Sequence, residues 1–164
     1  MNIRLNGIVN DSIVDGKGIR LAIFTQGCPH HCPKCHNPQT HDYQGGYNTD
    51  TDEIISIMKE NPLLDGITLS GGEPMEQANA CIILAEEAKK IGLNVWVYTG
   101  YTWEELLYKN EEIQKLLSFT DVLVDGPFVY SLRSLELCFK GSSNQRIIDV
   151  QRSLLQNSVV LENI

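Results

Sequence analysis

The stretch RLAIFTQGCPHHCPKC, residues 20–35, joins a short apolar run to a loop that contains three cysteines. The run Arg20–Thr25 is rich in residues that favour β-strands, so the loop begins just beyond the carboxyl end of a predicted strand. Cys28, Cys32 and Cys35 have the spacing C-x3-C-x2-C, and no fourth cysteine lies nearby. Iron–sulfur clusters are usually held by four thiolates. A cluster held by these three cysteines would leave one iron open to a ligand that is not protein.

A structural zinc site is the alternative for this loop. The three cysteines together with His31 or His36 would complete a Cys3His tetrahedron, and the spacing alone does not exclude it. Zinc sites of that kind typically combine two ligand pairs from separate segments, whereas all of these residues lie in one short loop. The tight loop therefore favours a cluster, and the loops farther along the chain strengthen that interpretation.

Predicted strands and helices alternate after the cysteine loop. Thr102 and Glu105 have the pattern of a capping box at the start of one helix. Strands separated by helices predict right-handed crossovers and a parallel sheet. From periodicity and turn residues we expect strands at 66–70, 94–98, 121–124 and 147–150, and helices at 49–59, 76–91 and 111–119.

Each of the first three of these strands ends in a polar or glycine-rich loop. Residues 70–74 read SGGEP, residues 98–100 read YTG and residues 125–127 read DGP. The carboxyl ends of parallel strands meet at one edge of a sheet, which is where α/β folds bind ligands. We therefore expect these loops to lie beside the cysteines.

The SGGEP turn offers more chemistry than an ordinary strand-to-helix turn. Gly71 and Gly72 let a ligand approach the backbone closely, and Glu73 offers a carboxylate to an ammonium group. Taken alone, the turn is a moderate signal, and it becomes strong when joined to the three-cysteine loop. For Asp125, ligand contact and simple capping of a turn or helix are equally open.

Composition limits the partners and the compartment. The chain has 164 residues, with 13 Lys+Arg against 21 Asp+Glu and a formal net charge of −8. This balance repels phosphate backbones and anionic bilayers, so we expect neither nucleic acid nor membrane as a partner. The length suits one domain spanning residues 1–164. Five cysteines, no signal pattern and no apolar run of membrane-spanning length indicate a protein of the reducing cytoplasm.

The cysteine spacing followed by Gly-Gly-Glu-Pro at 71–74 resembles the radical S-adenosylmethionine superfamily. Within it, the chain is most similar to the activating proteins of anaerobic (class III) ribonucleoside-triphosphate reductases. The segments that carry this closer resemblance are Asp15–Arg20, Val97–Tyr101, Val122–Phe128 and Gly141–Arg146.

The resemblance implies an enzyme, an oxidoreductase with no catalytic residue beyond a [4Fe–4S] cluster and S-adenosylmethionine. An electron from a donor such as reduced flavodoxin would cleave S-adenosylmethionine into methionine and a 5′-deoxyadenosyl radical. That radical would remove hydrogen from a glycine of the reductase large subunit and leave a glycyl radical. The implied metal ligands are Cys28, Cys32 and Cys35, with S-adenosylmethionine on the fourth iron, and the implied cofactor-binding residues are Gly71, Gly72, Glu73, Tyr98, Thr99 and Asp125.

The fold that the resemblance implies is α/β, an incomplete (β/α) barrel with mostly parallel strands, since the chain has too few βα units for eight. An open barrel has a lateral mouth. We expect the glycine-bearing segment of the reductase to enter there, over the loops at 98–102 and 125–130.

Two features depart from the pattern. Lys34 precedes the third cysteine, where superfamily members commonly have an aromatic residue, and the residues after that cysteine, 36–38, resemble those of pyruvate formate-lyase activators. Another glycyl-radical enzyme such as pyruvate formate-lyase is therefore an alternative target. A small radical cyclising enzyme and a zinc-stabilised binding module are the further alternatives.

Overall fold

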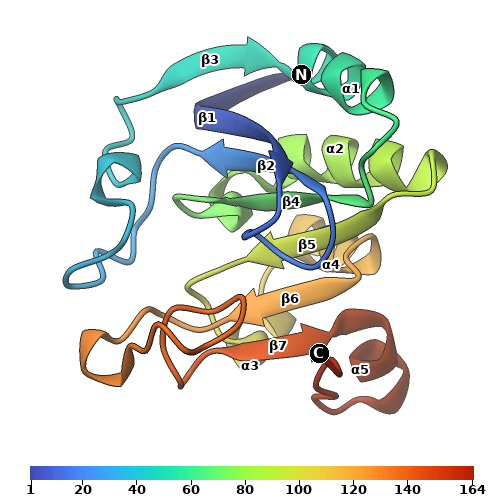
Figure 1. Ribbon diagram of the computed structural model, residues 1–164. Coiled ribbons are helices and arrows are strands. Elements are labelled where there is room, and N and C mark those ends of the chain that lie inside the picture. Colours follow the sequence, from blue (N-terminus) through green and yellow to red (C-terminus); the bar gives the residue numbers. More distant parts are fainter.

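The computed structural model describes residues 1–164 and places seven strands in one sheet, in the order β3-β1-β2-β4-β5-β6-β7 (Figure 1). Strands β2 to β6 all run in one direction, while β1 and β7 run antiparallel to their neighbours. The fold is therefore mixed α/β with a mostly parallel sheet, as the sequence predicts. The strands are β1 (Asn2–Ser12), β2 (Arg20–Thr25), β3 (Tyr47–Asp50), β4 (Gly66–Gly71), β5 (Asn94–Tyr98), β6 (Val122–Asp125) and β7 (Arg146–Asp149).

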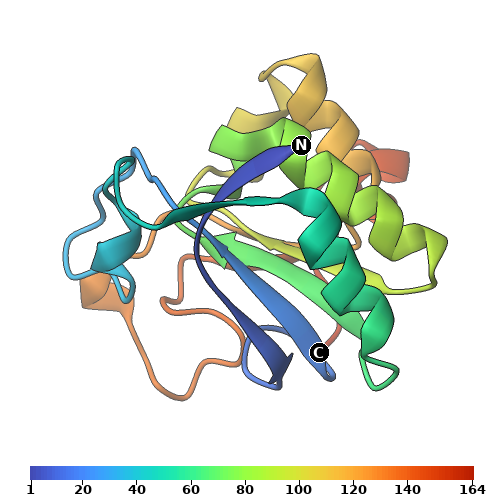
Figure 2. The same cartoon turned by 90° about the horizontal axis from the view of Figure 1, so that it is seen from above.

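The helices connect the parallel strands. Helix α1 leads into β4, α2 joins β4 to β5, and α3 with α4 joins β5 to β6. Seen from above, α1, α2 and α4 lie together on one face of the sheet (Figure 2). Their bounds are α1 (Thr51–Glu60), α2 (Ala78–Lys90), α3 (Trp103–Leu107), α4 (Glu111–Ser118) and α5 (Val150–Gln156).

Local signals in the sequence explain where several helices begin and end. The Asp50 carboxylate accepts a hydrogen bond from the Asp52 amide and caps α1. The capping box of Thr102 and Glu105 is present at the start of α3, as predicted. Helix α5 ends at Asn157, which adopts the left-handed conformation (φ +53°) that asparagine tolerates.

The two faces of the central strands bury different side chains. Alternate residues such as Leu69 and Val97 pack beneath the helices in the main core. Trp96 and Val124 point to the other face, where Phe139 packs against them in a smaller cluster. Because both faces of these strands are covered, they appear in the sequence as nearly continuous apolar runs.

Arg20 belongs to the amino ends of the strands, away from the cysteines. Its guanidinium is buried and donates to the Thr68 hydroxyl (2.8 Å), to the carbonyl of Ile67 (2.7 Å) and to Asn94. Burial lowers the pKa of Arg20 to about 10, and these acceptors satisfy the buried donors. This residue therefore joins three adjacent strands.

Four elements differ from the sequence prediction, namely β1, β3, β7 and the unexpected helix α5. Strands β1 and β3 were not expected, and they extend the sheet beyond β2 as an antiparallel pair. The last strand, predicted at 147–150, lies at Arg146–Asp149, and Val150 begins helix α5 because the Asp149 side chain caps it.

The carboxyl ends of β2, β4, β5 and β6 open at one edge of the sheet, on the left in Figure 1. Two long connections lie at this edge, residues 26–46 after β2 and residues 126–145 after β6. No helix of the protein combines the length and the apolar character needed to cross a membrane.

Candidate functional site

The cysteine loop follows β2 and is folded back by hydrogen bonds near its base. The Gly27 amide donates to the Thr40 carbonyl (2.7 Å), and the Cys28 amide donates to the His41 carbonyl (3.3 Å). The side chain of Gln26 donates to two further carbonyls in the returning half of the loop. These contacts hold residues 28–40 as a closed loop at the sheet edge.

The three cysteines differ in burial and in their contacts. Cys28 is buried, whereas Cys32 and Cys35 are partly exposed. The Cys35 amide donates to the Cys32 carbonyl (3.1 Å), and the Asn37 amide donates to the Cys35 sulfur (3.4 Å). The thiolate is the form of cysteine that binds metal.

A cavity of about 120 Å³ joins the cysteine loop to the ends of β4, β5 and β6. The loops that the sequence places at one edge therefore do meet there. Seven of the predicted site residues line this cavity: Cys28, Cys32, Cys35, Gly71, Gly72, Tyr98 and Thr99.

Gly71 and Gly72 are needed for the close approach of β4 to the cysteine loop. Gly71 has φ +97°, a conformation that favours glycine. A Cβ atom on Gly72 would collide with the carbonyl oxygens of Gly27 and Thr40. Backbone therefore packs directly on backbone at this point.

Glu73 does not line the cavity, and its side chain is fully buried. It accepts hydrogen bonds from the Thr99 hydroxyl (2.9 Å), the Gly100 amide (2.9 Å) and the Met75 amide (3.0 Å). The Nε2 atom of His30 lies 2.6 Å from Glu73 Oε1. One carboxylate thus connects the loops that follow β2, β4 and β5.

His30 is the main site residue that sequence reasoning did not identify. It lies between the first two cysteines, and its ring packs edge-on against Tyr101 with the ring centroids 4.5 Å apart. A Cβ atom on Gly100 would collide with the same ring. Its place between two cysteines was the available signal, but nothing in the sequence pairs it with Glu73.

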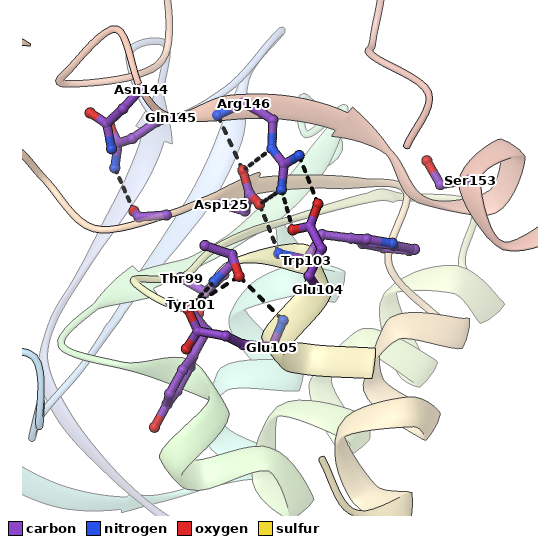
Figure 3. A network of polar contacts seen from close by, with 12 residues as sticks. Thr99, Tyr101, Trp103, Glu104, Glu105, Asp125, Asn144, Gln145, Arg146 and Ser153 are labelled. Atoms are coloured by element: carbon purple, nitrogen blue, oxygen red, sulfur yellow. Dashed lines mark hydrogen bonds and ion pairs between the residues drawn. The ribbon is translucent and has the colours of Figure 1, made fainter. Parts of the chain in front are cut away.

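Asp125 serves a different set of contacts from the cavity-lining residues (Figure 3). Its buried carboxylate accepts from the Trp103 amide (2.8 Å) at the start of α3 and from the guanidinium of Arg146 on β7. Arg146 also forms a bidentate ion pair with Glu104, with Nη1 3.0 Å from Oε1 and Nη2 2.7 Å from Oε2. The carboxylate of Asp125 thus caps α3 and ties it to β7.

The donor set at the cavity suits an iron–sulfur cluster. Burial raises the pKa of the Cys28 thiol to about 11, and metal coordination deprotonates a thiol outright. His41 also lines the cavity, and its Nε2 atom is buried without a hydrogen-bond partner. This nitrogen is therefore available to form a polar contact with a group bound in the cavity. No three side chains of the His, Cys, Asp and Glu types are gathered closely enough to hold a single metal ion.

Comparisons with known proteins agree with this donor set. The family model described as "4Fe-4S single cluster domain" matches residues 14–148. The anaerobic ribonucleoside-triphosphate reductase-activating protein of Salmonella typhi is 38% identical over 141 residues, covering 81% of this chain and 90% of that protein. Its namesake from Escherichia coli (strain K12) is 37% identical with the same coverage. The chain belongs to the anaerobic ribonucleoside-triphosphate reductase-activating proteins.

Membership in this family of activating proteins decides between the alternatives for the cysteine loop. The matched 4Fe-4S region encloses the loop and every strand-end turn described above, so the metal group is a [4Fe–4S] cluster and not zinc. The match extends over 90% of the length of each of these relatives. Among solved structures, QueE from Escherichia coli aligns with a TM-score of 0.48 and 18% identity, covering 62% of this chain and 54% of that chain.

Proposed function

We propose that this protein activates anaerobic ribonucleoside-triphosphate reductase, holding its [4Fe–4S] cluster through Cys28, Cys32 and Cys35. The bound cluster and S-adenosylmethionine supply the chemistry, a one-electron reductive cleavage whose 5′-deoxyadenosyl radical takes hydrogen from a reductase glycine. One observation carries the proposal, namely that three thiols of one loop share a cavity with the glycine turn after β4 in a chain of this family. The chain's own task is to hold, orient and shield these groups.

We assign the backbone of Gly71 and Gly72, with Glu73, to the amino group of S-adenosylmethionine. Gly71 packs on the end of β2 and Gly72 on the base of the cysteine loop, so a ligand on the open iron would lie near both glycines. Glu73 already accepts bonds from Thr99, Gly100 and His30. An ammonium group must therefore share this carboxylate with them or displace one of them.

Tyr98 and Thr99 are assigned to the wall of the cofactor site, and Asp125 to its outer support. The Tyr98 hydroxyl donates to the Phe139 carbonyl (2.7 Å), which fixes the ring against the 126–145 connection. The 120 Å³ cavity is smaller than the 300–1,000 Å³ typical of ligand pockets. S-adenosylmethionine would therefore extend beyond the cavity, over the loops after β5 and β6. At these loops Asp125 positions α3 and Arg146.

We further propose that residues 1–164 act as one domain and that the sheet is an incomplete (β/α) barrel. Its edge strands β3 and β7 do not pair with each other, which supports a lateral opening for the reductase segment. The electron donor we propose is a small carrier such as reduced flavodoxin. Free thiols as cluster ligands also suit the reducing cytoplasm.

Anaerobic reconstitution tests the proposal directly. The purified protein should bind iron and sulfide in equal amounts and, when reduced, cleave S-adenosylmethionine. Mixed with the cognate reductase, S-adenosylmethionine and a reductant, it should produce the doublet of a glycyl radical in electron paramagnetic resonance. Cleavage without a glycyl doublet would assign the chain to a different target, which the same measurement with pyruvate formate-lyase would examine.

A further inference from the structure

A groove beside the cysteine loop has a charge opposite to that of the molecule as a whole. It encloses about 700 Å³ and contains three cationic side chains, Lys34, Arg133 and Lys140, with no acidic residue in its lining. The whole chain carries 21 acidic residues against 13 Lys+Arg. We call this surface the basic groove, and it is lined by Lys34, His36, Phe128, Tyr130, Arg133, Ser134, Leu135, Leu137, Lys140 and Gly141.

Aromatic contacts build the groove from two distant segments. The ring of Tyr130 has the Lys34 ammonium 4.1 Å and the Arg133 guanidinium 3.8 Å from its centroid. The ring of His36 packs against Phe128 with the centroids 4.6 Å apart. The 126–145 connection is thereby fastened to the cysteine loop, and its cations are held in place.

The groove adjoins the metal ligands directly. Lys34 and His36 are the two sequence neighbours of Cys35, and both line the groove. Leu135 on its rim is fully exposed, and Leu132 and Tyr130 nearby are partly exposed. Exposed apolar side chains with cations around them are typical of a surface that binds another protein.

We propose that the basic groove is the docking surface for an acidic one-electron carrier protein. This inference rests on the proposed function, because the cluster must receive one electron from outside for each cleavage. In that step the carrier loses one electron and the cluster gains it, with no atom transferred. The net charge of −8 repels an acidic carrier over most of the surface, so the groove directs its approach to the side where Cys35 lies.

Charge complementarity is also suited to a transient electron-transfer complex. Electron-transfer encounters are small and short-lived, and steering by charge supports them more than buried area does. The groove with its rim of leucines is compact, and its cations remain accessible, since Lys34 and Arg133 are exposed.

The test separates two ways of reducing the cluster. Arg133→Glu reverses a charge in the groove, and Arg152→Glu makes the same change on α5, at the other end of the molecule (Figure 1). With reduced flavodoxin as the probe, Arg133→Glu should raise the carrier concentration for half-maximal cleavage of S-adenosylmethionine by about tenfold or more. Arg152→Glu should leave it unchanged. Added salt should narrow the difference between wild type and Arg133→Glu.

Dithionite provides the second arm, because it reduces the cluster without docking. Cleavage driven by dithionite should be equal in wild type, Arg133→Glu and Arg152→Glu. If wild type does not cleave with dithionite, the proposed function itself fails, whatever the groove does. If flavodoxin drives cleavage equally in all three proteins, or if Arg133→Glu lowers only the glycyl radical formed on the reductase, the docking inference is overturned.

Discussion

Cys32 lies partly exposed in the cysteine loop, so its replacement tests metal binding with little cost to the core. Cys32→Ala should lose S-adenosylmethionine cleavage by more than about 100-fold, because loss of a ligand exceeds the 10–100-fold effect of outer partners. The measurement is cleavage under dithionite, together with iron and sulfide content. Cys138→Ala, at an exposed cysteine outside the cavity lining, is the matched control and should keep both. Retained cleavage in Cys32→Ala would remove the cysteine loop from the site.

His30 contacts Glu73, and we expect it to act as a positioning residue through this carboxylate. His30→Ala leaves the buried carboxylate short of one partner, so the free energy of unfolding should fall by about 1–3 kcal/mol. His30→Gln keeps a side-chain N–H for Glu73 and should recover part of the loss. Urea unfolding of the protein measures this difference.

A second readout separates positioning from simple stability. Addition of S-adenosylmethionine should change the electron paramagnetic resonance spectrum of the cluster. The concentration of S-adenosylmethionine that gives half of this change should be higher for His30→Ala than for wild type. His31→Asn, at the exposed neighbouring residue, is the control. A variant that is destabilised but has the wild-type dependence on S-adenosylmethionine would show that His30 supports only the fold.

The sequence predicted the residues that act through local spacing and missed those that act through tertiary contacts. The cysteine spacing and the paired glycines are visible in a few consecutive residues. The contact between His30 and Glu73 joins positions 43 apart, and it depends on how the loop folds back. Asp125 shows the same limit, since the sequence left capping and ligand contact equally open and only the structure reveals its bond to Arg146.

Among the elements, the buried parallel strands were predictable and the edge strands were not. Strand β5 matches its predicted range, 94–98, because its run of apolar and aromatic residues has an unambiguous β preference. Strand β1 contains asparagine, aspartate and glycine, and β3 reads YNTD, so neither has the composition of a buried strand. Both lie at the antiparallel edge of the sheet, where one side can face water.

The contact between the β4 turn and the cysteine loop gives a prediction about elements. Gly72→Ala places a methyl group against the carbonyl oxygens of Gly27 and Thr40, which are backbone atoms that no side-chain rotation can move. The turn and the loop must therefore separate, which should cost about 1–3 kcal/mol of unfolding free energy and most of the cleavage activity. Gly7→Ala is the control, because a Cβ atom there meets nothing within 4 Å. Equal behaviour of the two variants would contradict close packing at Gly72.

The stability contributed by the ion pair between Glu104 on α3 and Arg146 on β7 should depend on pH. The hydrogen bond from Arg146 lowers the pKa of the Glu104 carboxyl. A carboxyl whose folded pKa is depressed adds stability above its unfolded pKa, and this stability disappears as pH falls through the folded pKa. Glu104→Gln should therefore lower the unfolding free energy near neutral pH, by less than about 1 kcal/mol since the side chain is 58% exposed.

Urea unfolding at two pH values measures this effect. The difference between wild type and Glu104→Gln should shrink once the pH falls below the ordinary glutamate range of about 4.3. Glu136→Gln, at an exposed glutamate in the 126–145 connection, is the matched control. A constant difference at all pH values would mean that the charge of Glu104 does not contribute.

In the molecule as a whole, the loops that contain the proposed functional residues all lie at the carboxyl ends of the parallel strands. The cavity and the basic groove both have Phe128 in their lining, and Cys35 of the cavity is followed directly in the sequence by His36 of the groove. An electron carrier in the groove would therefore lie next to a reductase segment held over the loops after β5 and β6. The amino ends of the strands, held by Arg20, take no part in either.

Hydrogen exchange distinguishes the two surfaces. The reductase should protect residues 98–102 and 125–130, the loops after β5 and β6 at the proposed lateral opening, because its glycine-bearing segment must be held against the site. The amides of Thr99 and Gly126 already donate to the carbonyls of Val124 and Tyr101, so the added protection should appear at their neighbours. Reduced flavodoxin should instead protect the rim of the basic groove at 131–137. Unchanged exchange at 98–102 and 125–130 with bound reductase would exclude entry by this route.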